Sequence, residues 1–230
     1  MKPIGLIGGT SWESSLEYYR LLNRMTAERL GQPHSAELIM YSMDFAKLDG
    51  LRKLDRWDMI ETMIVGYAEQ LKAAGAGFLL LCANTLHKIA DEVEAGGGLP
   101  LLHIADVTAA EIKRNGLDRI GLLGTRITME ERFYSGRFQE RHGITAIIPD
   151  EPDRMEIDRI IFNELTRSEF RESSREFFRG VIGSLVGRGA RGIVLGCTEI
   201  PLLVRQEDSP VPVFDTMKLH AAAAVERALG

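Results

Sequence analysis

Short apolar segments alternate with longer amphipathic segments along the whole chain. Eight of the short segments are rich in leucine and β-branched residues, which predicts strands at 4–8, 38–43, 78–82, 99–104, 119–124, 145–148, 192–196 and 211–214. The longer segments carry apolar residues at helical spacing, most clearly in one stripe made of Trp57, Ile60, Ile64, Tyr67 and Leu71. Strands that alternate with helices in this way predict an α/β fold with parallel sheets.

The sequence also marks where two of these helices begin and end. Thr10 and Glu13 have the spacing of a capping box at the start of the first helix. Gly75 stands where a glycine cap would end the helix that carries the Trp57 stripe. These residues predict one helix directly after the first strand and another directly before the third.

The two halves of the chain share two sequence patterns. The segment IGLIGGT at 4–10 recurs as IGLLGT at 120–125, and LLCANT at 80–85 corresponds to VLGCTE at 194–199. Both offsets are close to half of the chain length. Each half therefore predicts a small α/β unit that begins with a strand and a glycine turn. Coincidence is the alternative, since glycine turns follow apolar strands in many α/β proteins.

The composition narrows the class of protein. With 230 residues, 45% hydrophobic and 27% charged, the chain can fold around a sizeable core. A net charge of −5 without a basic, aromatic-rich stripe argues against nucleic acid as a partner and favours a small molecule. The apolar runs are shorter than the roughly 20 residues of a membrane span, and the N-terminus lacks the apolar core of a signal peptide. We therefore expect a soluble cytoplasmic protein with no membrane partner.

The chain has two cysteines, Cys82 and Cys197. They are too few for a disulfide framework or a thiolate zinc site, so we expect free thiols. Cys197 follows an apolar strand and precedes Pro201, which suits the first turn of a helix. A helix N-terminus lowers the pKa of a thiol from about 8.5 and makes the thiolate available as a base or nucleophile. An inert buried cysteine is the alternative.

Other chemistry-bearing residues follow predicted strands as well. Ligands of open parallel sheets bind beyond the carboxyl ends of the strands, which directs attention to 8–11, 83–85, 124–128 and 197–199. The 8–11 turn offers N–H groups at a helix N-terminus, an arrangement that favours a carboxylate or phosphate, although a plain tight turn is an equal reading. Its spacing is not GxGxxG, so we do not expect a dinucleotide site.

Side chains at these strand ends have two readings, as helix caps or as ligand contacts. Asn84 is an N-cap candidate that could also donate to a substrate, and Thr125 and Thr128 have the same double reading. Arg126 is the cation that the sequence places near a strand end. His220, in the last helix after Asp215-Thr216, is more commonly a satisfied or surface histidine.

Four motifs in this order resemble the aspartate/glutamate racemase superfamily, specifically its amino-acid racemase branch. They are GGTSWES at 8–14, CANTLH at 82–87, GTRITM at 124–129 and GCTEI at 196–200, followed by Asp215-Thr216. The resemblance implies two similar Rossmann-like parallel-sheet domains that face each other across a cleft, at 1–105 plus 210–230 and at 106–209. It also implies a homodimer that needs neither pyridoxal phosphate nor metal.

The resemblance implies catalysis by two opposed thiols, of which one removes the α-proton and the other protonates the opposite face. Cys197 matches the second-half thiol, but the first-half position is Ala83 in this sequence. Cys82 lies one residue earlier, and strand alternation predicts that its side chain points away from the substrate. The residues expected to bind substrate lie in the four motifs: Gly9, Thr10, Ser11, Asn84, Thr85, Thr125, Thr128, Thr198 and Glu199.

Three functions are compatible with these residues. The first is a cofactor-independent amino-acid racemase for aspartate, glutamate or a related amino acid, in which water, Thr85 or a shifted Cys82 replaces the missing thiol. The second is a single-thiol decarboxylase, lyase or isomerase of the same superfamily, with Cys197 acting on one face. The third is a non-catalytic binder of small acids.

Overall fold

The computed structural model describes all residues, 1–230, and divides into two compact units. Unit 1 comprises Met1–His103 and His220–Gly230, and unit 2 comprises Ile104–Leu219. Each unit contains one parallel sheet with helices around it, so the predicted α/β class is confirmed. None of the helices combines the length and apolar character that a membrane span requires.

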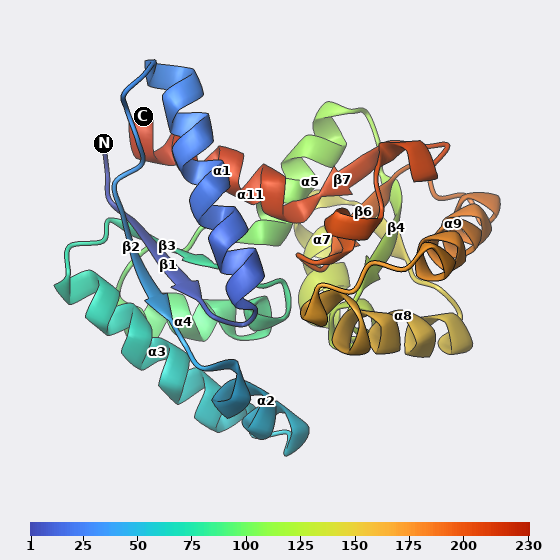
Figure 1. Cartoon of the computed structure of the whole chain (residues 1–230), viewed down its shortest axis with the longest axis horizontal. Coiled ribbons are helices and arrows are strands. Elements are labelled where there is room, and N and C mark those ends of the chain that lie inside the picture. Colours follow the sequence, from blue (N-terminus) through green and yellow to red (C-terminus); the bar gives the residue numbers. More distant parts are fainter. The chain divides into compact units, whose positions relative to one another are not determined.

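Unit 1 is built on a sheet of three parallel strands in the order β2-β1-β3. The strands are β1 (Ile4–Gly8), β2 (Leu38–Ser42) and β3 (Phe78–Leu81). The helical elements are α1 (Trp12–Leu30), α2 (Phe45–Lys53), α3 (Trp57–Ala73), η1 (Thr85–Ile89), α4 (Ala90–Gly97) and most of α11 (Thr216–Leu229) (Figure 1). The strand order, with right-handed crossovers, places α1 and α3 on opposite faces of this sheet.

Unit 2 has four parallel strands in the order β5-β4-β6-β7. They are β4 (Arg119–Gly124), β5 (Thr145–Ile147), β6 (Ile193–Gly196) and β7 (Val213–Asp215). The helical elements are α5 (Ile104–Arg114), α6 (Arg126–Glu130), α7 (Arg132–His142), α8 (Glu151–Asn163), η2 (Leu165–Arg167), α9 (Glu172–Gly187), α10 (Ile200–Leu203) and η3 (Gln206–Asp208) (Figure 1).

The apolar stripes predicted from the sequence form the cores of the two units. In unit 1, Ile60 and Ile64 of α3 pack with Leu79 and Leu81 of β3. In unit 2, a cluster from β4, β6, α8 and α9 surrounds the chain where β6 ends, and Cys197 belongs to it. The strand end that carries the thiol is therefore held by a packed core.

One predicted strand is wrong. Residues 99–104 form no strand, because only Leu101 makes a bridge, to Leu79. Pro100 has no N–H to donate, so the pairing is limited to the Pro100 carbonyl accepting from Leu79 N–H and to Leu102 N–H donating to the Leu79 carbonyl. The chain then enters α5 at Ile104.

The chain returns to unit 1 at His220, whereas the domain boundary expected from the sequence was residue 210. The reason is that β7 pairs with β6, with Val194 opposite Phe214. This strand therefore belongs to the second sheet, and α11 begins in unit 2 and continues into unit 1.

The start of α1 lies one residue later than the predicted capping box. Ser11 is the N-cap, and its Oγ accepts from the N–H of Ser14. The preceding turn requires glycine, because Gly9 has a φ of 87° and a Cβ there would lie 2.2 Å from the Met43 carbonyl oxygen. The glycine turn thus lets the chain leave β1 while it passes against the backbone of Met43.

Candidate functional site

The carboxyl ends of β4 and β6 lie side by side in unit 2. Gly124 is paired in register with Gly196, so the next residues, Thr125 and Cys197, leave neighbouring strands together. A Cβ at Gly124 would lie 2.8 Å from the Gly196 carbonyl oxygen. Glycine at this position therefore allows the strand ends to approach closely, and it brings the threonine and the thiol to the same edge of the sheet.

Cys197, Thr198 and Glu199 form a compact polar group directly after β6. The Cys197 thiol donates to Oε2 of Glu199 at 3.0 Å, and the Thr198 hydroxyl donates to the same oxygen at 2.9 Å. All three side chains are buried. The sequence assigned Glu199 to substrate binding and missed this pairing with the thiol, although a carboxylate two residues after a strand-end cysteine was the signal for it.

The sequence predicts a lowered pKa for the Cys197 thiol, and the structure shows the opposite. Burial raises the pKa of Cys197 well above that of an ordinary thiol, and the Glu199 carboxylate raises it further. The N–H groups of Glu199 and Ile200 lower the pKa but are outweighed. The helix expected to stabilise a thiolate, α10, has only four residues. Cys197 therefore rests as a thiol whose hydrogen is donated to Glu199.

Thr125 and Thr128 are joined at the start of α6. Thr125 is the N-cap and its Oγ1 accepts from the Thr128 N–H at 3.3 Å, while the two hydroxyl oxygens lie 3.1 Å apart. Arg126, between them, is exposed and forms an ion pair with Glu130. Thr125 therefore acts as a helix cap, as one of its two predictions stated. The predicted cation, Arg126, forms its ion pair with Glu130 of the same helix.

The 8–11 turn of unit 1 uses several of its own hydrogen bonds internally. Gly9 N–H donates to Oγ of Ser15 at 2.8 Å, and Oγ of Ser15 donates to the Ser11 carbonyl at 2.9 Å. The Ser11 hydroxyl donates to Glu13 at 3.1 Å. The N–H of Gly9 is therefore already hydrogen-bonded to Ser15. Within the anion-binding turn expected from the sequence, this leaves the Thr10 and Ser11 end to contact a bound anion.

The second strand end of unit 1 carries the residues of the CANTLH motif. Cys82 is fully buried, and burial raises the pKa of its thiol. Ala83 is partly buried and packs with the cluster that contains Leu79 and Leu81. Asn84 occupies the predicted N-cap position directly before η1, which begins at Thr85, but its backbone angles are helical and its side chain makes no capping hydrogen bond.

Three buried histidines gather beside this strand end, and the sequence identified none of them as a group. The ring centroids of His87 and His103 are 4.6 Å apart, and those of His87 and His220 are 5.8 Å apart. Nδ1 of His87 donates to the Ala83 carbonyl at 2.9 Å. No spacing rule could have found the cluster, because its members are far apart in the chain. The structure contains no group of three His, Cys, Asp or Glu side chains that could hold a metal ion.

His220 is held in its neutral form. Its Nε2 lies 2.8 Å from the Leu102 carbonyl oxygen, so this nitrogen carries the hydrogen, and its Nδ1 accepts from the Tyr18 hydroxyl at 2.9 Å. Burial lowers the pKa of His220 to about 4. His220 is therefore a buried histidine with both ring nitrogens hydrogen-bonded, as predicted.

We expect His220 to make stability dependent on pH. The unfolded chain binds a proton at His220 below pH 6.5, whereas the folded chain binds it only near pH 4. Unfolding is therefore favoured as pH falls through this window, by about 3 kcal/mol in total. In urea unfolding, His220→Gln should lose less free energy of unfolding than the parent between these pH values. His34→Gln, which alters an exposed histidine, is the control and should follow the parent curve.

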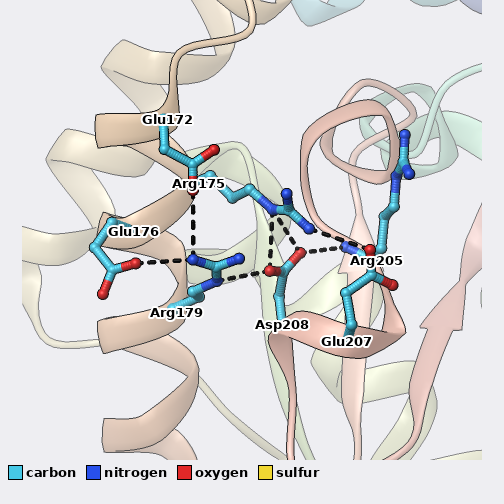
Figure 2. A network of polar contacts seen from close by, with 7 residues as sticks. All are labelled: Glu172, Arg175, Glu176, Arg179, Arg205, Glu207 and Asp208. Carbon is cyan, nitrogen blue, oxygen red and sulfur yellow. Dashed lines mark hydrogen bonds and ion pairs between the residues drawn. The ribbon is translucent and has the colours of Figure 1, made fainter.

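The segment that leaves Glu199 through α10 is anchored to α9. The buried carboxylate of Asp208 accepts from Nε of Arg175 at 3.0 Å and from Nε of Arg179 at 2.7 Å, and also from the Arg205 N–H at 2.9 Å. Figure 2 shows both guanidinium groups reaching from α9 to this carboxylate. The loop that follows the thiol and carboxylate is therefore held at its far end by charged hydrogen bonds.

The fold and this group of residues define an α/β protein with a buried thiol, hydrogen-bonded to a carboxylate, at the end of a parallel strand. The sequence matches the family described as Asp/Glu/Hydantoin racemase over residues 7–224. The chain belongs to this family, and the resemblance drawn from its four motifs is confirmed.

Individual relatives agree with this assignment. The structure of a candidate Asp/Glu racemase from Yersinia pestis is similar with 50% identity and a TM-score of 0.94, covering 100% of both chains. An aspartate racemase homologue from Pyrococcus horikoshii OT3 has 33% identity and a TM-score of 0.87, again over 100% of both chains. The broad specificity amino-acid racemase RacX of Bacillus subtilis (strain 168) is 23% identical over 177 residues, 76% of this chain and 74% of RacX.

Proposed function

We propose that this protein is an amino-acid racemase of the aspartate/glutamate type that works without a cofactor, with Cys197 moving the α-proton of the substrate. The observation that carries the proposal is the 3.0 Å hydrogen bond from the Cys197 thiol to Glu199 in a chain of the racemase family. The substrate class follows the names of its relatives, which include an aspartate racemase homologue, a glutamate racemase and a broad specificity amino-acid racemase.

The pairing of Cys197 with Glu199 gives the thiol a proton acceptor. Glu199 takes the thiol proton, and the thiolate then removes the α-proton, which leaves the electron pair of the broken C–H bond on the α-carbon and its carboxylate. Delivery of a proton to the opposite face produces the other enantiomer. In the reverse direction the Cys197 thiol delivers its proton to the α-carbon, and Glu199 then returns a proton to the resulting thiolate.

Hydroxyl groups at the neighbouring strand end suit the carboxylate of such a substrate. Thr125 and Thr128 present paired hydroxyls directly after β4, which is adjacent to the strand that carries Cys197. We assign to them the binding of the substrate α-carboxylate. Thr198 donates to Glu199 and keeps that carboxylate oriented toward the thiol.

A second candidate function is supported by Ala83. The resemblance places the other catalytic thiol at this position, where the chain has only a methyl group, and Cys82 is fully buried. A proton for the opposite face then comes from water or Thr85. If neither supplies it, Cys197 works on one face only, as in a decarboxylase, lyase or isomerase.

Incubation with aspartate, glutamate and neutral amino acids in deuterated water separates these functions. Loss of optical rotation with uptake of deuterium at the α-carbon supports the racemase. Uptake with retained configuration shows that one face works, and binding without exchange shows a non-catalytic binder of small acids. The Cys197→Ser protein is the control for exchange that does not depend on this thiol.

Glu199→Gln is expected to separate thiol reactivity from catalysis. Replacing the carboxylate by an amide removes one cause of the raised pKa of Cys197, the negative charge of Glu199, and weakens another, because an amide oxygen accepts the thiol hydrogen less strongly. The curve of iodoacetamide alkylation rate against pH should therefore move to lower pH. Because the proton acceptor is lost, turnover should fall on the order of 10²-fold.

The matched control is Glu207→Gln, which neutralises an exposed carboxylate of the same unit. It should leave both the alkylation curve and turnover near those of the parent. An unchanged alkylation curve in Glu199→Gln would contradict the pairing of this carboxylate with Cys197.

A further inference from the structure

His87 holds the turn that follows β3 through two hydrogen bonds. Its backbone N–H donates to the Asn84 carbonyl at 3.1 Å. Its ring Nδ1 lies 2.9 Å from the Ala83 carbonyl oxygen, and because a carbonyl can only accept, this nitrogen carries the hydrogen. The His87 side chain is buried. One residue therefore fixes the carbonyl groups of the two residues that lead out of the strand.

The geometry of η1 explains why a side chain is needed for the first of these carbonyls. In an α-helix the N–H of residue 87 would donate four positions back, to the carbonyl of residue 83. Because η1 is a 3-10 helix, this N–H donates three positions back, to Asn84. On the strand side, the Cys82 N–H donates to the Ile7 carbonyl at 2.9 Å. The Ala83 carbonyl lies between these two sets of backbone bonds, and the ring of His87 supplies its donor.

The two other buried histidines hold the ring of His87 in place. The ring of His103 meets it at 61° and that of His220 at 66°, both edge-on. His220 is itself fixed between the Tyr18 hydroxyl and the Leu102 carbonyl. Burial lowers the pKa of His87 well below that of an ordinary histidine, and the two neighbouring histidines lower it further. His87 is therefore neutral, with its hydrogen on Nδ1.

We propose that His87 is a positioning residue for the second proton transfer. This inference rests on the proposed racemase function, in which water or Thr85 protonates the face opposite Cys197. Fixing the Ala83 carbonyl fixes the path of the backbone between β3 and η1, and with it the place from which that proton is delivered. His87 acts only through the backbone of this turn. Small displacements of a proton donor have large effects on rate, so the loss of this hydrogen bond should be seen in turnover.

Leucine and asparagine at position 87 form a matched pair, because they have nearly the same shape and differ in the hydrogen-bond donor. The amide nitrogen of asparagine is as many bonds from the backbone as Nδ1 of histidine. His87→Asn can therefore still donate to the Ala83 carbonyl, whereas His87→Leu cannot. His87→Gln carries its amide nitrogen one bond further and is a second, polar variant without a donor at this place. Ile60→Val removes one methyl group from the core of the same unit and is the control for lost stability.

Exchange in deuterated water measures the two faces separately. For the enantiomer whose α-proton faces Cys197, deuterium uptake with retained configuration reports this thiol alone, and uptake with inversion also requires the opposite face. His87→Leu should lower the ratio of inversion to retention about tenfold with little change in KM, and His87→Asn should restore most of it. Ile60→Val should leave the ratio unchanged. Equal losses on both faces in His87→Leu would show a role in stability alone and would overturn the proposal.

A second measurement does not depend on the proposed function. Ala83→Cys places a thiol on the turn, and its alkylation by iodoacetamide, followed by peptide mapping, reports how firmly the turn is held. Adding His87→Leu should speed alkylation at position 83 about fivefold, because the lost hydrogen bond lets the turn open more often, and His87→Asn should reverse this.

The two measurements separate the two proposals. A parent chain that does not racemise, together with this alkylation pattern, would contradict the racemase function and still support the hold of His87 on the turn. Alkylation at position 83 that is equally fast with histidine, leucine and asparagine at position 87 would overturn the role of His87.

Discussion

Replacement of Cys197 by serine is expected to lower kcat/KM for racemisation by about 10²- to 10⁴-fold, the usual contribution of a well-placed acid/base group. The hydroxyl of serine has a far higher pKa than a thiol, so Glu199 cannot remove its proton at neutral pH. Substrate binding should change little, because the hydroxyls of Thr125 and Thr128 are retained. The measurement is racemisation rate together with α-proton exchange in deuterated water.

Cys82→Ala is the matched control for this experiment. Its thiol is fully buried and has a raised pKa, so it should take no part in proton transfer. Removing the sulfur leaves a small gap in the core of unit 1 and is expected to cost about 1 kcal/mol of the free energy of unfolding. Activity in folded protein should remain close to that of the parent. A loss of activity as large as in Cys197→Ser would contradict the assignment of the two thiols.

Ala83→Cys is expected to raise racemisation by about 10²- to 10⁴-fold, because it returns a proton carrier to the position where the family resemblance places one. Ala83 is only partly buried and follows β3, so a side chain larger by one sulfur atom is compatible with folding there. The measurement is loss of optical rotation with acidic and with neutral amino acids.

Ala83→Ser is the control for size and polarity, since it adds a hydroxyl in place of the thiol. It should give a smaller gain than Ala83→Cys because the hydroxyl is much less acidic. Folded Ala83→Cys protein that racemises no faster than the parent would show that position 83 does not deliver the second proton. The one-face reaction of Cys197 would then be the better account of this protein.

The periodic features of the chain could be read from the sequence. Short apolar runs identified seven strands, because strands buried on both faces of a parallel sheet are apolar throughout, and helical spacing of apolar residues identified the α3 stripe. The four motifs identified the family and Cys197, since glycines and small polar residues must recur where parallel strands end close together. The strand predicted at 99–104 is wrong because Pro100 restricts its pairing to a single bridge. The apolar character of the segment does not reveal this restriction.

The sequence by itself thus determined the α/β class, the family and the strand-end position of Cys197. Only the tertiary structure decided the state of that thiol, because its pKa depends on burial and on the direction of the Glu199 side chain rather than on the nearby start of α10. The cluster of His87, His103 and His220 is likewise formed only by folding, because its members come from different segments of the chain. Burial of His87 and His220 lowers the pKa of both imidazoles.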